Sequence, residues 1–126
     1  MVPNEEVQEY YSLSKEYLEA ALTNLRKKLY DPAMANGIHS LELAIKATLC
    51  SVVKEPIKTH NVGGLFGKHF RNKFGDETCR KINLILMKYN LPRYPGEETL
   101  KSNVISEDIH FIEDFIKNKI PRVLKM

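Results

Sequence analysis

A chain of 126 residues with 43% hydrophobic and 28% charged residues has the size and composition of one globular domain, spanning residues 1–126. The formal net charge of +3 is too small for a dedicated nucleic-acid binder, although it permits attraction to phosphate groups. No hydrophobic run approaches the roughly 20 residues that cross a bilayer, and the acidic start MVPNEEVQEYY is unlike a signal peptide, so we expect a cytoplasmic protein without a membrane segment.

Hydrophobic residues in the first half of the sequence recur at helical spacing. In residues 4–29 the positions of one hydrophobic seam recur every three or four residues, as on one face of a helix. Cationic side chains gather in the last turn. Asp31 as a cap and Pro32 at the first helical position then begin a second helix, whose seam runs from Met34 to Val52. Because the break between these helices is very short, they must pack antiparallel as a hairpin.

The second half of the sequence predicts shorter helices. Residues 60–73 form a third helix, which we expect to be irregular because it contains three glycines, and residues 77–90 form a fourth. Ser106 is the expected cap of the last helix, and Pro121 is expected to end or kink it. No segment alternates as a strand does. The sequence therefore predicts an all-α fold, an up-and-down antiparallel helical bundle of four to five helices, with Cys50 and Cys79 as reduced thiols in its core.

Several residues are candidates for ligand binding. Two prolines bracket Arg93 and Tyr94 in a stiff loop, where an arginine beside an aromatic ring can grip a phosphate and stack on a base. The same pair can equally brace the bundle, with the tyrosine packed and the arginine bonded to helix-end carbonyls. A histidine at a helix start can bind an anion or act as a cap. Basic residues also concentrate between positions 54 and 81. The selected candidates are His60, Arg93 and Tyr94, with Lys58 and Lys46 in support.

Catalytic and metal-binding patterns are missing from the sequence. It contains no Walker phosphate loop, no HExxH pair and no zinc spacing, so we predict no catalytic residue, no metal and no cofactor. Glu42 and Lys46 lie four positions apart on the second helix, which favours a surface ion pair or a partly buried pair at the edge of the seam.

Three stretches resemble one family. The run LELAIKATL places a glutamate and then a lysine on the second helix, KTHNVGGL opens the third helix, and LPRYPG precedes the last one. Together they resemble the HEPN domain superfamily over about residues 6–124, in particular its small stand-alone prokaryotic members. The resemblance implies a bundle of four or five helices that commonly dimerises. Many members pair with a small nucleotidyltransferase protein, and many others are toxins that cut RNA.

The nuclease members of that superfamily carry an arginine followed by four to six residues and then a histidine, near the start of the last long helix. In this chain His39 follows Arg26 by thirteen positions and His110 follows Arg93 by seventeen. No arginine and histidine fall in the required window. The sequence is therefore similar to the uncharacterised branch that lacks the ribonuclease motif, and we expect that it is not an enzyme.

These observations lead to a function hypothesis and two alternatives. The first is a non-catalytic, homodimeric HEPN-like module that binds a nucleotide or RNA phosphate, a small nucleotidyltransferase partner, or both, in a toxin–antitoxin-like or regulatory role. One alternative is a metal-independent ribonuclease with a rearranged Arg/His pair. The other is a purely structural homodimeric interaction protein, which would have a large apolar dimer face and no electropositive cleft.

Overall fold

Helices account for nearly all of the chain that the computed structural model describes, namely residues 5–53, 62–89 and 102–125. No strand occurs in these three ranges, which confirms the predicted all-α fold. The elements in chain order are α1 (Glu5–Arg26), α2 (Tyr30–Cys50), α3 (Val62–Phe74), α4 (Asp76–Tyr89), α5 (Ser102–Asp114), the π-helical turn η1 (Phe115–Lys119) and α6 (Ile120–Leu124).

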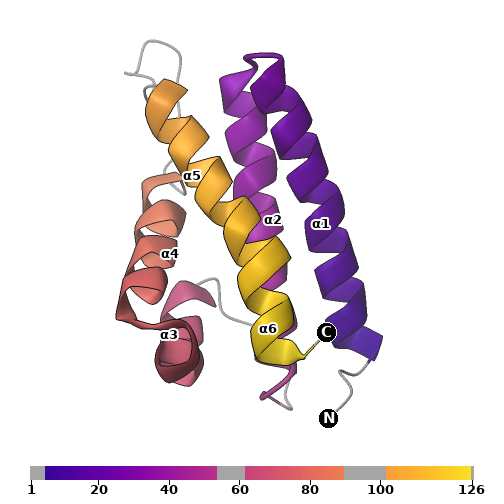
Figure 1. Ribbon diagram of the computed structural model, residues 1–126, viewed down its shortest axis with the longest axis vertical. Helices are drawn as coiled ribbons and strands as arrows, with labels where there is room; N and C mark the ends of the chain where they lie inside the picture. The colour runs from indigo at the N-terminus through magenta and orange to yellow at the C-terminus, as the bar shows by residue number, and fades with distance from the viewer. Residues whose placement is uncertain (1–4, 54–61, 90–101, 126) are drawn as a thin grey trace.

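The long helices α1 and α2 form the predicted antiparallel hairpin (Figure 1). The reversal depends on Lys28, whose φ of 61° lies in the left-handed region. The predicted cap was wrong, because Leu29 is the N-cap of α2 and makes no side-chain cap hydrogen bond, while Asp31 lies inside the first turn. There its charge still suits the positive end of the helix dipole.

The C-terminal helix α5 packs against both helices of the hairpin, and α3 and α4 lie on the side of the bundle away from α1 (Figure 1). The predicted start of this helix at Ser106 was wrong, since α5 begins at Ser102. The earlier start places Ile105 on the same buried seam as Ile109 and Ile112. The extra turn therefore buries a further hydrophobic side chain against the bundle.

Pro121 neither ends the last helix nor stands inside a regular α-helix. The helix continues to Leu124, and the turn before the proline widens into η1, where the Ile120 N–H donates to the Phe115 carbonyl. In an α-helix the proline ring would clash with the carbonyl of Lys117, four residues earlier. The wider turn moves that carbonyl out of the way, so the hydrophobic seam continues through Ile116 and Ile120, both fully buried.

A buried tyrosine completes the hydrogen bonding of the π-helical turn. In the wider register the Ile116 carbonyl would accept from residue 121, but a proline has no N–H to donate. The Tyr11 hydroxyl, from α1, donates to this carbonyl at 2.8 Å instead.

Tyr11→Phe is expected to lower the free energy of unfolding by about 1–2 kcal/mol, because it leaves the buried Ile116 carbonyl without this donor. Urea denaturation followed by circular dichroism measures the change. Tyr17→Phe removes a hydroxyl that has no hydrogen-bond partner in the described part of the chain, and it should change the stability by less than about 0.5 kcal/mol. Equal losses in the two variants would contradict the assigned role of Tyr11.

An aromatic part of the hydrophobic core lies beneath α3. Phe66 and Phe70 are fully buried, and their rings stack with centroids 5.3 Å apart. Phe74 and, from η1, Phe115 complete the aromatic cluster. Cys79 is buried and Cys50 is half-buried; both are free thiols, and burial raises the pKa of each.

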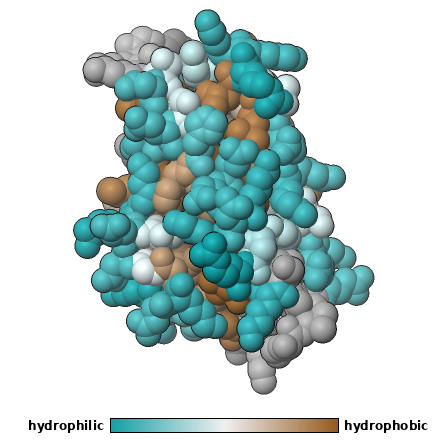
Figure 2. All heavy atoms as spheres, viewed as in Figure 1, coloured by the Kyte–Doolittle hydropathy of each residue, from teal (hydrophilic) through white to brown (hydrophobic). Residues whose placement is uncertain are grey.

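Hydrophilic residues dominate the face of the molecule in Figure 2, where hydrophobic residues show mainly as narrow strips between helices. In the described parts of the chain, each helix is too short or too polar to cross a membrane.

Candidate functional site

The structure leaves most of the predicted binding residues untested. Lys58, His60, Arg93 and Tyr94 lie outside the described residues. Lys46 is half-buried on α2 and lies close enough to Cys50 for its charge to act on the thiol pKa. No ion pair joins Lys46 to Glu42, although both residues are described and both are half-buried.

A groove of about 400 Å³ lies between α3 and α4. Its α3 wall begins with glycines, so that backbone rather than side chains forms this part of the surface. A Cβ on Gly63 would overlap the Asn83 Oδ1 and lie 3.1 Å from Leu86 Cδ1, so any larger residue would require these side chains of α4 to move. The lining residues are Gly63, Gly64, Gly67, Arg71, Asp76, Cys79, Arg80, Asn83 and Leu84.

Glycines did not make α3 irregular, contrary to the sequence-based prediction. The helix is α-helical over 13 residues. Burial of Phe66 and Phe70 on one side and close packing of Gly63 against α4 on the other offset the low helix propensity of glycine. Gly75, with φ at 92°, then supplies the left-handed residue that ends α3 and turns the chain into α4.

The groove carries positive charge from two arginines. The Arg71 Nε lies 3.2 Å from Asp76 Oδ1, and both side chains are largely exposed. Arg80 is exposed, and no other described residue forms an ion pair or hydrogen bond with its guanidinium. The half-buried amide of Asn83 also has no hydrogen bond to another described residue. Arginine presents several N–H donors in a planar fork that matches phosphate oxygens, so the groove suits an anionic ligand.

A different face of α4 forms ion pairs with a buried carboxylate. Asp108, from α5, is 1% exposed, and its two carboxylate oxygens lie 3.1 Å from the Lys81 Nζ and 3.2 Å from the Lys88 Nζ. Because α5 begins at Ser102, Asp108 lies beyond the first turn of this helix. Lys81 and Lys88 are seven residues apart and share one helix face, but the acid that they meet depends on how α5 packs.

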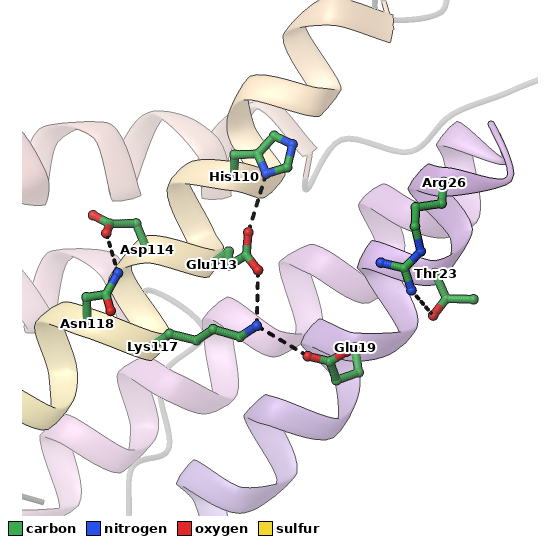
Figure 3. A network of polar contacts seen from close by, with 8 residues as sticks. All are labelled: Glu19, Thr23, Arg26, His110, Glu113, Asp114, Lys117 and Asn118. Carbon is green, nitrogen blue, oxygen red and sulfur yellow. Dashed lines mark hydrogen bonds and ion pairs between the residues drawn. The ribbon is translucent and has the colours of Figure 1, made fainter.

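A surface network joins α5 and η1 to α1 (Figure 3). Lys117 bridges two carboxylates, with its Nζ 3.1 Å from Glu113 Oε2 and 3.4 Å from Glu19 Oε1. His110 Nδ1 lies 3.4 Å from the other oxygen of Glu113. The hydrogen bond from Lys117, followed by that from His110, lowers the pKa of Glu113. The network connects α1 with α5 and η1, and none of its residues lines the groove.

Glu113→Gln is expected to reduce stability by about 0.5 kcal/mol near neutral pH, since the network is partly exposed. The folded-state pKa of Glu113 lies below its unfolded value of about 4.3. Its contribution is therefore present above that pH and is lost as the pH falls through the folded-state pKa. Urea denaturation at about pH 7 and about pH 3 should show the difference shrinking in acid. Glu107→Gln removes a carboxylate at an exposed position on the same helix and should change the stability at about pH 7 by less than Glu113→Gln does.

Sequence reasoning placed basic charge around α3 but did not select Arg80 or Asn83. Their spacing of three residues puts them on one face of α4, which is visible in the sequence. Many surface residues of helices have the same spacing, so it does not identify a binding site. What distinguishes them is the glycine-lined wall opposite, and that requires the packing of α3 on α4. Among the described residues, no group of three or more His, Cys, Asp or Glu side chains could hold a metal ion.

Comparison with known proteins identifies the family. No curated protein matches the sequence. The model of the HEPN domain matches residues 7–120, a range that contains the α1–α2 hairpin, the groove between α3 and α4, the ion pairs of Asp108 and the π-helical turn. Because the match extends over most of a chain that folds as an all-α bundle, as this family does, the chain belongs to the HEPN domain family.

Proposed function

We propose that this chain is a single-domain HEPN binding module and that the groove between α3 and α4 binds the phosphate groups of a nucleotide or RNA. Membership of the HEPN family supports a function related to nucleotides or RNA. The observation that carries the proposal is the exposed guanidinium of Arg80, which has no partner among the described residues and stands beside a wall of glycine backbone. A phosphate can approach this wall at Gly67, where a Cβ would lie 4.0 Å from the Arg71 Nη2, whereas the Asn83 side chain covers Gly63.

The other groove residues can assist Arg80. Arg71 is held by an exposed ion pair to Asp76, and pairs of this kind contribute only about 0–1 kcal/mol, so a phosphate can compete for this guanidinium at small cost. The Asn83 amide offers a donor and an acceptor at the same wall. Leu84 adds an apolar surface on which part of a base or sugar can rest.

Lys58, His60, Arg93 and Tyr94 remain candidates for the same ligand. Lys58 and His60 directly precede α3 in the chain, and Arg93 and Tyr94 follow α4. Each pair is thus connected to one of the two helices that form the groove. Lys46 remains a supporting candidate. We propose further that the module is non-catalytic and homodimeric and pairs with a small nucleotidyltransferase protein in a toxin–antitoxin-like or regulatory role.

Arg80→Glu is expected to weaken binding of a short fluorescein-labelled single-stranded RNA at least about tenfold, because the change removes a charge-assisted contact and adds repulsion. Fluorescence anisotropy titration measures the affinity, and the slope of affinity against salt should become shallower. Lys27→Glu makes the same charge change at an exposed position outside the groove and should alter binding far less.

If Arg80→Glu and Lys27→Glu bind RNA equally, the groove is not the binding site. The ribonuclease alternative predicts that the protein cuts this RNA and that the double variant His60→Ala/Arg93→Ala does not. A wild-type protein that neither binds nor cuts RNA or nucleotides would favour the purely structural alternative.

A further inference from the structure

The N-terminal half of α1 carries an acidic face centred on one exposed leucine. Glu5, Glu9 and Glu16 surround Leu13, whose exposed fraction is 40%, and neither this hollow nor the adjoining one contains a lysine or arginine. Within the described residues, no ion pair neutralises these three carboxylates. We call Glu5, Glu9, Leu13 and Glu16 the acidic face.

The side of the bundle formed by α3 and α4 carries an excess of basic side chains, although Asp76 also lines its groove. Arg80, Leu84 and Met87 follow each other on α4 at intervals of four and three residues, so they share one helix face. Leu84 and Met87, at 55% and 69%, have the largest exposed fractions among the large hydrophobic residues that the structure describes. Lys68 is exposed on α3, three residues before Arg71 of the groove. We call Lys68, Arg80, Leu84 and Met87 the basic face.

These two faces match in polarity and charge. The acidic face lies along α1 and lines two hollows, whereas the basic face borders a groove with a glycine-lined wall. Each face has exposed hydrophobic side chains among charged ones, which is the anatomy of a protein interface. The signs of the charges are opposite, which favours association and selects the orientation. Both faces are exposed in the single chain.

We infer that the acidic face of one copy docks into the basic face of a second copy. Figure 1 shows why this contact is made between chains: α1 lies at one edge of the bundle and α3 and α4 lie at the opposite edge, with α2 and α5 between them. One pair of copies formed in this way leaves one acidic face and one basic face unused. The contact is therefore head-to-tail and distinct from the symmetric contact of the proposed homodimer, and further copies extend it into an open chain or close it into a ring.

The groove that is proposed to bind phosphate lies at the basic face, so a docked α1 covers it with carboxylates. RNA and a second copy then compete for Arg80. The association itself does not depend on the proposed function, because it is expected of the protein alone.

Sedimentation velocity of the full chain without RNA tests this inference. The average mass of the wild type should rise with protein concentration beyond that of a dimer, and added salt should reverse the rise. The variants Glu9→Lys/Glu16→Lys and Lys68→Glu/Arg80→Glu should each associate at least about tenfold more weakly, because each places like charges at the contact. All four positions are exposed, so the fold should persist, which circular dichroism checks.

Mixing the two variants supplies the decisive measurement. The native basic face of one variant can bind the native acidic face of the other. The two altered faces have exchanged their charges and are again opposite in sign, so they can also bind each other. The mixture should therefore regain the concentration-dependent growth in mass. Lys27→Glu/Arg122→Glu changes the net charge as much as Lys68→Glu/Arg80→Glu does, at exposed positions outside both faces, and should associate as the wild type does.

A wild-type mass that does not change with concentration would overturn the inference, and so would variants that associate as the wild type does or a mixture that stays dissociated. Glu9→Lys/Glu16→Lys leaves the groove unaltered, so it should lose self-association and keep RNA binding. Loss of association with retained RNA binding therefore separates this interface from the proposed function.

Discussion

Phe66→Ala is expected to lower the free energy of unfolding by about 3–5 kcal/mol, the range for truncating a large buried aromatic side chain. Phe66 is fully buried, and its ring centroid lies 5.3 Å from that of Phe70, 5.2 Å from that of Phe74 and 5.7 Å from that of Phe115. Its removal leaves a cavity where α3 meets η1. Since a domain is stable by only about 5–15 kcal/mol, this single change should bring the protein close to unfolding.

Urea denaturation measures this effect, and Phe66→Leu is the matched control because it keeps most of the buried volume. We expect the leucine variant to lose about 1–2 kcal/mol. A loss below about 1 kcal/mol for Phe66→Ala would mean that the aromatic cluster does not join α3 to the C-terminal helix.

Asp108→Ala is expected to lower stability by about 2–3 kcal/mol. Breaking a buried ion pair costs about 3–5 kcal/mol when the remaining charge cannot reach water. Here the side chains of Lys81 and Lys88 are 40% and 35% exposed, so both ammonium groups can turn toward solvent and the loss is smaller. The change should also loosen α4 against α5, because both lysines lie on α4.

Two comparisons isolate the contribution of the Asp108 carboxylate. Asp108→Asn keeps the shape and one acceptor oxygen and should lose about half as much stability. Asp114→Ala, at an exposed position six residues further along the chain, should lose less than about 1 kcal/mol. Thermal denaturation of the three variants ranks their losses of stability. An Asp114→Ala loss equal to that of Asp108→Ala would contradict the special role of the Asp108 carboxylate.

The helices that were predicted best are those in which one hydrophobic seam is long and uninterrupted. The α1–α2 hairpin follows from such seams and a very short connection, and the structure confirms it. The errors occurred mainly at helix ends, although the expected irregularity of α3 was also wrong. Ser106 is a good capping residue, yet burial of Ile105 stabilises an earlier start more than a cap at Ser106 would. The prediction that Pro121 ends or kinks the helix took account only of the ring clash and the missing N–H. The wider π-helical turn avoids the clash, and the Tyr11 hydroxyl donates to the Ile116 carbonyl in place of that N–H.

The candidate site was predictable only in its general location. Positive charge between positions 54 and 81 is visible in the sequence, but Lys81 proves to be engaged by Asp108, whereas Arg80 beside it is free of described partners. Adjacent residues on a helix point about 100° apart, and only the positions of the neighbouring helices decide which one meets a buried acid. Lys58, His60, Arg93 and Tyr94 stay predictions, since they lie outside the described residues.

The sequence alone determined the fold class, the antiparallel hairpin and the HEPN family, because periodic hydrophobic seams and short motifs are properties of neighbouring residues. Only the tertiary structure decided what the polar residues do. Asp108 is a buried partner of Lys81, Gly63 lies where α3 packs closely on α4, and Arg80 is an exposed charge beside a groove. Each of these environments is set by the helices packed beside the residue. Contacts between segments far apart in the chain set the environment of a charge, and that environment determines whether the charge holds the fold or remains available to a ligand.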